Sequence, residues 1–228
     1  MGIRERRSRE KDERRRAILE AARRLIARRG VEGTSMNQLA ESTELNKATL
    51  YLYFEDKDDL VDALVYEGLL LLEKEYQQAD RQPLSGIARV LNLVRTTFAF
   101  YKKHPVYFHV LHHQERRRAS ARRNTPFAAK GNEAAARVFD TIAKGLEQGI
   151  EDGSIRGGID IPMFLVLLYA QTYGVTHTIH AKQDIYRDVF HLDPTAIERS
   201  ALGLIEYQLR SDRSTRSKGK AIPWNRRL

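Results

Sequence analysis

The sequence contains no cysteine. This absence excludes disulfide bonds, thiolate nucleophiles and zinc sites built on cysteine, and it suits a reducing compartment. Long apolar runs are also missing. The longest runs, such as residues 164–170, are far too short to cross a bilayer, and residues 1–16 lack the apolar stretch of a secretory signal. We therefore expect no membrane association and a cytoplasmic location.

Charge is plentiful but unevenly placed. The formal net charge is +9 and the isoelectric point is about 9.8. Basic side chains dominate residues 1–29, whereas residues 30–60 hold more acidic than basic side chains. A basic balance favours an acidic partner such as a nucleic acid, but it says nothing of the fold. Attraction to such a partner would have to come largely from the N-terminal residues.

Apolar residues recur at helical spacing along most of the chain, and no segment has the pattern of a strand. The first helix carries an apolar stripe that includes Ile18, Ala22 and Leu25, and Gly30 is expected to end it. Thr34 or Ser35 can cap a second helix that ends near residues 42–44.

A third short helix is expected from Asn46 to Tyr53, followed by a long fourth helix capped by Glu55 or Asp56. Later helices are expected near residues 91–101, 106–114, 126–150, 162–181 and 194–209. Residues 183–192 have the composition of a linker. The sequence thus predicts an all-α protein.

Two short amphipathic helices joined by a tight turn, at about residues 35–54, have the architecture of a helix-turn-helix. The second helix must present small and hydrogen-bonding side chains to base edges in the major groove. Lys47, Ala48 and Thr49 suit this task. Tyr51 and Tyr53 carry hydroxyl groups on long, stiff side chains that can reach phosphates.

The run LNKATLYLYFEDKDDL, residues 45–60, resembles the signature of the TetR family, and the resemblance extends over about residues 12–64. It implies an N-terminal three-helix DNA-binding domain followed by a larger helical ligand-binding and dimerisation domain. It also implies that Leu45, Leu50 and Phe54 pack the small core. The implied DNA contacts are to phosphate for Thr34, Tyr51, Tyr53 and Lys57, and to bases or phosphate for Lys47, Ala48 and Thr49.

Two residues depart from the family pattern. Glu44 stands where the turn usually has glycine, so either it keeps a left-handed backbone at a cost of about 1 kcal/mol or the turn differs. Leu52 lies between the two tyrosines, where relatives often have a polar residue. An exposed leucine there either contacts thymine methyl groups or packs, so the operator sequence does not follow from the resemblance.

The predicted domain organisation has four parts: a basic flexible arm at residues 1–11, the helix-turn-helix domain at 12–56, the ligand-binding and dimerisation domain at 57–210, and a basic disordered tail at 211–228. Two interpretations of the arm stay open. Its arginines, among them Arg4, Arg6, Arg7 and Arg9, either enter the minor groove or form a solvated tail.

An effector pocket is implied for the second half of the chain, where aromatic side chains are frequent. His109 and His113 lie four residues apart, a spacing that can hold a metal, but no further ligand pattern supports this. We expect no metal and no cofactor. The candidate ligand-binding residues are Tyr101, Phe108, His109, His112, Phe139, Gln171, Tyr173 and His177.

The last two predicted helices resemble the pair through which this family forms dimers. Their expected interface stripes are Leu168, Thr172, Val175 and Ile179 on one helix, and Ile197, Ala201, Leu204, Ile205 and Gln208 on the other. We expect a homodimer that binds double-stranded DNA at a palindromic operator and is released by a small, largely apolar effector.

Two other classes of function were weighed. A small-molecule enzyme lacks support, because the sequence has no nucleophile–base pair, phosphate-binding loop or metal motif. A non-specific architectural or RNA-binding protein would bind all sequences equally and give no palindromic footprint.

Overall fold

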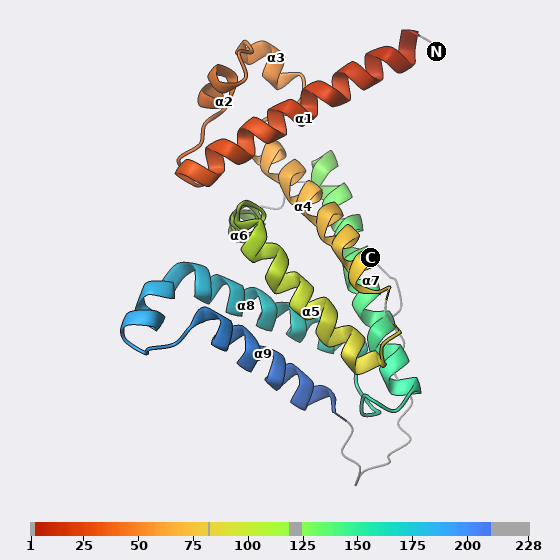
Figure 1. The fold of residues 1–228 in the computed structure, drawn as a ribbon. Coiled ribbons are helices and arrows are strands. Elements are labelled where there is room, and N and C mark those ends of the chain that lie inside the picture. Colours follow the sequence, from red (N-terminus) through yellow and green to blue (C-terminus); the bar gives the residue numbers. More distant parts are fainter. Residues whose placement is uncertain (1–2, 82, 119–124, 211–228) are drawn as a thin grey trace. The chain divides into compact units, whose positions relative to one another are not determined.

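The computed structural model describes residues 3–81, 83–118 and 125–210. Within these ranges the chain forms α-helices and no strand, as the sequence predicts (Figure 1). The helices are α1 (Ile3–Arg29), α2 (Met36–Ser42), α3 (Lys47–Tyr51), α4 (Lys57–Ala79), α5 (Gly86–Lys103), α6 (Pro105–Arg118), α7 (Pro126–Glu151), α8 (Ile161–Asp188) and α9 (Pro194–Leu209). None of the described helices combines the length and the apolar character that crossing a bilayer requires.

The chain divides into two compact units. Unit 1 comprises Met1–Leu71 and Lys103–Ala135, and unit 2 comprises Leu72–Lys102 and Ala136–Leu228. Helices α4 and α7 each contribute to both. The division differs from the expected boundary after residue 56, because α6 and the beginnings of α4 and α7 belong with the N-terminal helices.

A buried carboxylate explains this grouping. Asp62 on α4 is fully buried, and it accepts hydrogen bonds from Gln114 Nε2 at 2.8 Å and Arg117 Nη2 at 2.6 Å, both on α6. Thr125 Oγ1 donates to its other oxygen at 2.9 Å and also caps α7. A buried charge needs such partners, so this network ties three helices together inside unit 1.

The apolar stripe of α1 packs as its spacing predicts. Ile18, Ala22 and Leu25 are buried, and they belong to a small core that includes Leu39 of α2 and Leu50 of α3. Helix α1 ends at Arg29 because Gly30 adopts a left-handed backbone with φ 69°, a conformation that glycine takes without steric cost.

Helix α1 begins much earlier than expected. Residues 3–11 continue the helix, where the sequence analysis expects a flexible arm. Arginine, lysine and glutamate are good helix formers, and pairs one turn apart add to stability, such as Arg6 Nε with Glu10 Oε1 at 3.0 Å. A high content of charged residues therefore does not make residues 3–11 disordered. Residues 1–2 and the predicted tail at 211–228 lie outside the described residues.

Unit 2 contains a close approach between α5 and α7. A Cβ atom added to Gly86 would lie 2.0 Å from the Gly149 nitrogen, so only glycine fits. Asp152 Oδ2 accepts a hydrogen bond from the Gly86 amide at 2.7 Å. A Cβ atom on Gly145 would lie 3.0 Å from Val90 of α5, so Gly145 also permits this approach, whereas Gly149 leaves room for Ile155.

Helices α8 and α9 pack against each other (Figure 1). Helix α8 was expected to end near Ala181, but it continues to Asp188 through a kink at Lys182, where φ is −139°. The predicted linker at 183–192 is therefore wrong for residues 183–188. The polar residues of this segment form ion pairs along the helix instead, as Arg187 does with Asp184 at 2.9 Å. Helix α9 begins as predicted, with Asp193 as its cap.

Candidate nucleic-acid interface

The turn between α2 and α3 has the tight form of a helix-turn-helix. Ser35 caps α2 in a capping box with Gln38, and Asn46 caps α3 by accepting from the Thr49 amide at 2.7 Å. Between them Glu44 adopts a left-handed backbone with φ 53°. The departure from glycine thus keeps the family's turn geometry, at a cost of about 1 kcal/mol.

Helix α3 is a single helical turn held from its inner side. Leu50 is fully buried and Phe54 is 1% exposed, so both anchor α3 to the core of unit 1. Leu45 is half-buried. The helix ends at Tyr51, two residues earlier than predicted, although Leu50 O still accepts from the amides of Tyr53 and Phe54.

The outer side of α3 is open. Lys47 and Ala48 are exposed, Thr49 is half-buried, and Tyr51 is 46% exposed. Leu52 is 75% exposed, which is high for an apolar side chain without a partner. This arrangement gives a rigid helix whose polar and small side chains all face solvent, as contact with base edges and phosphates requires.

Thr34 has a structural role that the sequence did not reveal. Its side chain is 3% exposed, and its hydroxyl donates to the Gly30 carbonyl at 2.8 Å. A phosphate oxygen only accepts hydrogen bonds, so a contact from this hydroxyl would require it to leave Gly30. The predicted phosphate contact of Thr34 stays a prediction.

Lys57 opens α4 beside a cluster of carboxylates. Asp56 caps the helix by accepting from the Asp59 amide at 2.9 Å, and Asp59 accepts from the Glu55 amide at 3.1 Å. Asp59 is 4% exposed. Burial raises the pKa of Asp59, and the neighbouring carboxylates of Glu55, Asp56 and Asp62 add to this rise, while the Glu55 amide lowers it.

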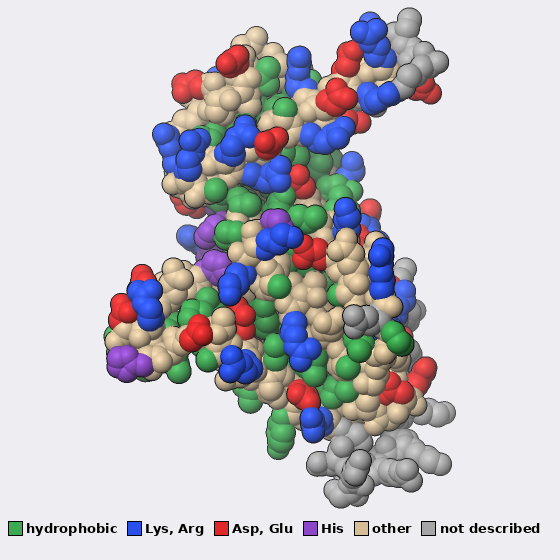
Figure 2. Space-filling model, in the orientation of Figure 1, with side chains coloured by type: hydrophobic (Ala, Val, Ile, Leu, Met, Phe, Trp, Pro, Cys, Tyr) green, Lys and Arg blue, Asp and Glu red, His purple; other side chains and the backbone are tan. Residues whose placement is uncertain are grey.

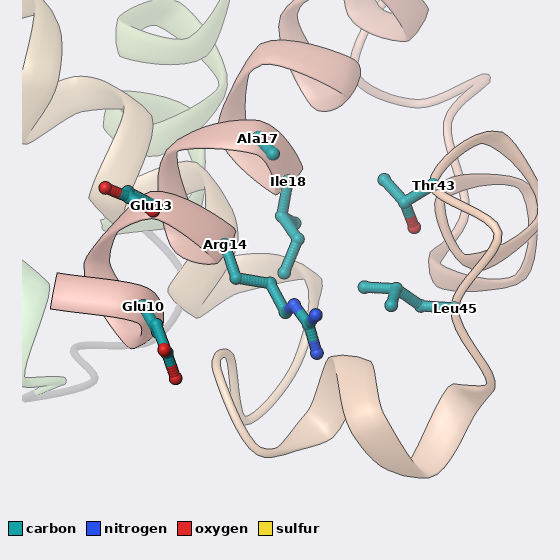
Figure 3. Close-up of a pocket in the computed structure, with 7 residues that line it drawn as sticks. All are labelled: Glu10, Glu13, Arg14, Ala17, Ile18, Thr43 and Leu45. Atoms are coloured by element: carbon teal, nitrogen blue, oxygen red, sulfur yellow. The ribbon is translucent and has the colours of Figure 1, made fainter. Parts of the chain in front are cut away.

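Two grooves lie between α1 and the helix-turn-helix. The first, of about 430 Å³, is lined by α1 and by Thr43 and Leu45 of the turn, and Arg14 points into it (Figure 3). The second, of about 480 Å³, runs beside the end of α3. Its lining residues are Arg7, Glu10, Lys11, Arg14, Leu52 and Tyr53. Lys11 and Arg14 were not among the predicted contact residues; Lys11 lies in the segment that was expected to be a flexible arm.

The eight candidate ligand-binding residues do not fall in one unit. Phe108, His109 and His112 lie on α6 in unit 1, and the other five lie in unit 2. Phe108 is buried and stacks with His112, whereas His109 is exposed. Within the described ranges, no three histidine or carboxylate side chains lie close enough to share a metal ion.

In unit 2, α8 carries a row of aromatic rings. Tyr169, Tyr173 and His177 follow each other at helical spacing, with ring centroids 5.8 and 6.3 Å apart. Phe139 of α7 packs edge-on against Tyr169 at 5.9 Å. Tyr169 was not among the candidate ligand-binding residues, although it lies four residues before Tyr173 and therefore on the same face of the helix. Gln171 lies apart from this row, since it contacts Gln208 of α9 at 3.4 Å on an exposed surface.

Buried phenols give unit 2 a polar centre. Tyr76 is 2% exposed and shares a hydrogen bond of 2.6 Å with Thr97, and burial raises the pKa of Tyr76 to about 12. Burial, with added effects of Tyr76 and Tyr173, also raises the pKa of Tyr101. The hydroxyls of Tyr76 on α4 and Tyr101 on α5 therefore stay neutral at physiological pH. Tyr101 and Tyr173 were predicted, and Tyr76 was missed.

An α2–turn–α3 unit with a buried inner side and an open outer side defines the class of helix-turn-helix DNA-binding proteins. Residues 18–64 match the family described as bacterial regulatory proteins, tetR family. The transcriptional repressor KstR2 of Mycolicibacterium smegmatis is 26% identical over 151 residues, which cover 66% of this chain and 71% of that protein.

Solved structures share the fold. The transcriptional regulator FadR of Bacillus subtilis, in complex with stearoyl-CoA, has a TM-score of 0.67 at 18% identity and covers 85% of this chain and 98% of its own. AibR, in complex with isovaleryl coenzyme A and operator DNA, has a TM-score of 0.63 at 22% identity. The match covers 86% of this chain and 99% of the AibR chain. Residues 18–64 therefore carry a DNA-binding domain of the TetR type, and the relatives to which the chain is similar are named transcriptional regulators.

Proposed function

We propose that the protein is a homodimeric repressor that binds a palindromic operator and is released from it by a small, largely apolar effector. The observation that carries this proposal is the outer side of α3. Lys47 and Ala48 at its N-terminal end are exposed, while Leu50 and Phe54 fix the helix from within. Such a helix can enter the major groove without rearranging its own core.

A dimer is supported by exposed apolar side chains on α8 and α9. The expected interface stripes need correction, because Leu168, Thr172 and Ile205 are buried within the chain. Leu204 of the predicted stripe is exposed, and the other exposed apolar side chains of these helices include Met163, Val166 and Leu167 on α8 and Tyr207 on α9. A soluble monomer rarely exposes so many apolar residues together, and a two-fold dimer through them would read a palindrome.

The effector proposal rests on the interior of unit 2. An aromatic row that includes Tyr173, together with the buried hydroxyls of Tyr76 and Tyr101, suits a ligand with an apolar body and a polar group. FadR and AibR, which share the fold, were crystallised with coenzyme A thioesters. Acyl-CoA thioesters are therefore the first class to test here. An effector that binds the DNA-incompetent state more tightly would shift the population off the operator.

The proposal is tested by titrating the protein against the duplex upstream of its own coding sequence and against random duplex, both at one fixed salt concentration. We expect the upstream duplex to bind roughly 10³-fold or more tightly and to give a two-fold symmetric footprint. Equal affinity for both duplexes would contradict the proposal. Adding acyl-CoA of increasing chain length to the bound complex then tests the effector class.

A further inference from the structure

One stripe of α1 changes character along the helix. Between residues 18 and 25 it consists of apolar side chains that pack into the core of unit 1. Continued toward the N-terminus at the same spacing of three and four residues, the stripe is formed by Arg14, Lys11 and Arg7. All three are exposed. The side of α1 that packs on the helix-turn-helix therefore becomes basic where the helix extends beyond that core.

This basic row borders the end of α3. Arg7, Lys11 and Arg14 line the 480 Å³ groove together with Leu52 and Tyr53. Tyr53 is one of the residues for which the family resemblance implies a phosphate contact. A DNA strand whose phosphate reaches Tyr53 would thus pass next to three cationic side chains on α1.

The acidic residues nearby do not neutralise the row. Glu10 also lines the groove, but it pairs with Arg6 at 3.0 Å. Glu13 points away from the turn, whereas Arg14 points toward it (Figure 3). Along the described part of α1, no carboxylate forms an ion pair with Arg7, Lys11 or Arg14. Figure 2 shows basic side chains along the length of α1 with acidic ones between them.

We propose that Arg7, Lys11 and Arg14 form a phosphate-binding row that holds one strand of the operator beside Tyr53. The row spans roughly 10 Å along the helix axis, at 1.5 Å per residue. One strand of B-DNA presents a phosphate about every 3.4 Å of its axis, so about three phosphates face the row. This inference rests on the proposed function, because it requires α3 to bind DNA.

The helical form of this segment argues against both interpretations of the basic N-terminus, an extended arm in the minor groove and a disordered tail. A helix with its side chains is about 10–12 Å wide, whereas the minor groove of B-DNA is about 6 Å wide. Residues 3–11 are helical, so they cannot enter the minor groove as an extended arm. Long basic side chains on a helix instead reach phosphates at the groove edge, where they add affinity but carry no sequence information.

The experiment compares the salt dependence of DNA binding between wild type and the triple variant Arg7→Gln, Lys11→Gln, Arg14→Gln. The logarithm of affinity falls with the logarithm of salt concentration by about 0.9 per phosphate neutralised. We expect the slope to shrink by roughly 2–3 per bound protomer and the affinity at low salt to fall at least tenfold. The preference for upstream over random duplex should stay unchanged.

A matched control removes the same number of charges from α1 away from the groove, with Arg9→Gln, Arg16→Gln and Arg24→Gln; Arg6 is kept because it pairs with Glu10, which lines the groove. Its slope should change by less than half as much. Lys11→Gln alone should lower the slope by about 1 per protomer, and Arg7→Lys with Arg14→Lys should keep it. Circular dichroism on each variant checks that α1 stays helical.

The possible results separate the two proposals. Wild-type protein that shows no preference for its upstream DNA contradicts the proposed function. Wild-type protein that prefers this DNA, with a triple variant whose slope equals that of the control variant, overturns the phosphate-binding row and leaves the proposed function standing.

Discussion

The two units bury polar groups of different kinds. Unit 1 buries the carboxyl group of Asp62 and surrounds it with donors: Gln114 and Arg117 of α6, and Thr125, which caps α7. Unit 2 buries neutral phenols such as Tyr76 and Tyr101 among aromatic rings. A buried charge tolerates little displacement of its partners, whereas a neutral hydroxyl can exchange one partner for another. The difference suits a rigid support for α3 in unit 1 and an adaptable interior in unit 2.

The largest effect is expected from Asp62→Ala. This change leaves Arg117 without its shortest ion pair, at 2.6 Å, and should lower the free energy of unfolding by about 3–5 kcal/mol. Chemical denaturation followed by circular dichroism measures it. Asp58→Ala is the control, because Asp58 pairs with the same arginine but is 31% exposed, and its loss should cost less than about 1 kcal/mol. Equal losses would show that the buried network does not define unit 1.

In unit 2, Gly86→Ala should be the most damaging small change. The new methyl group would meet the backbone of Gly149 at 2.0 Å, and helices α5 and α7 would have to separate. We expect a loss of about 1–3 kcal/mol in thermal or chemical unfolding. Gly131→Ala is the matched control, since a Cβ there meets nothing within 4 Å and should stabilise α7 by about 0.5–1 kcal/mol. A neutral Gly86→Ala variant would contradict the described packing.

Tyr76→Phe tests how unit 2 holds its hydroxyls. Thr97 donates its own proton to Leu93 O at 3.1 Å, so Tyr76 is the donor in the 2.6 Å bond to Thr97. Removal of the Tyr76 hydroxyl should lower the free energy of unfolding, measured by chemical denaturation, by about 0.5–1.5 kcal/mol. Tyr51→Phe on the exposed side of α3 should leave this free energy unchanged.

The same variant has a signature at alkaline pH. The pKa of Tyr76 rises from 10.0 in the unfolded chain to about 12 in the fold. The protonated phenol therefore contributes fully to the free energy of unfolding below pH 10, and this contribution is lost as the pH rises toward 12. Tyr76→Phe should remove this part of the alkaline decline in the melting temperature. An unchanged decline would mean that the phenol ionises freely in the fold.

The smallest effect is expected from Asp59→Asn in unit 1. Because the pKa of Asp59 is raised above 3.8, the folded state holds this proton more tightly than the unfolded state, and stability falls as pH rises above 3.8. The variant should melt slightly higher than wild type at pH 7 and equally at pH 3.5. A variant that melts lower at pH 7 would show that its charge stabilises α4 through the helix dipole instead.

Local features of this fold were predictable and distant ones were not. The caps at Ser35 and Asn46, the C-terminal end of α1 at Gly30 and the beginning of α9 after Asp193 follow from residues close by in the sequence. The partners of Asp62 lie more than fifty residues away, so no local pattern revealed them. Helix α1 was cut short because a run of charges was taken as disorder, although its residues favour a helix.

In the candidate site, too, the residues that could be predicted are those whose role depends on their neighbours in the sequence. The outer residues of α3 were predicted because their types and spacing carry the signal. The role of Thr34 was missed, because its hydrogen bond to Gly30 depends on how the loop folds back on α1. Lys11 was missed because it falls in the segment that was expected to be a flexible arm, and Arg14 was missed because its direction depends on how α1 packs against the turn.

The most direct test of the account compares Lys47→Ala and Tyr51→Phe on the upstream duplex and on single-base variants of it. Tyr51→Phe should weaken binding to all duplexes by a similar factor, because a phosphate contact does not depend on sequence. Lys47→Ala should lose about 1–3 kcal/mol of discrimination at one base pair of each half-site and little elsewhere. If both variants bind every duplex as tightly as wild type does, α3 is not the helix that reads the DNA.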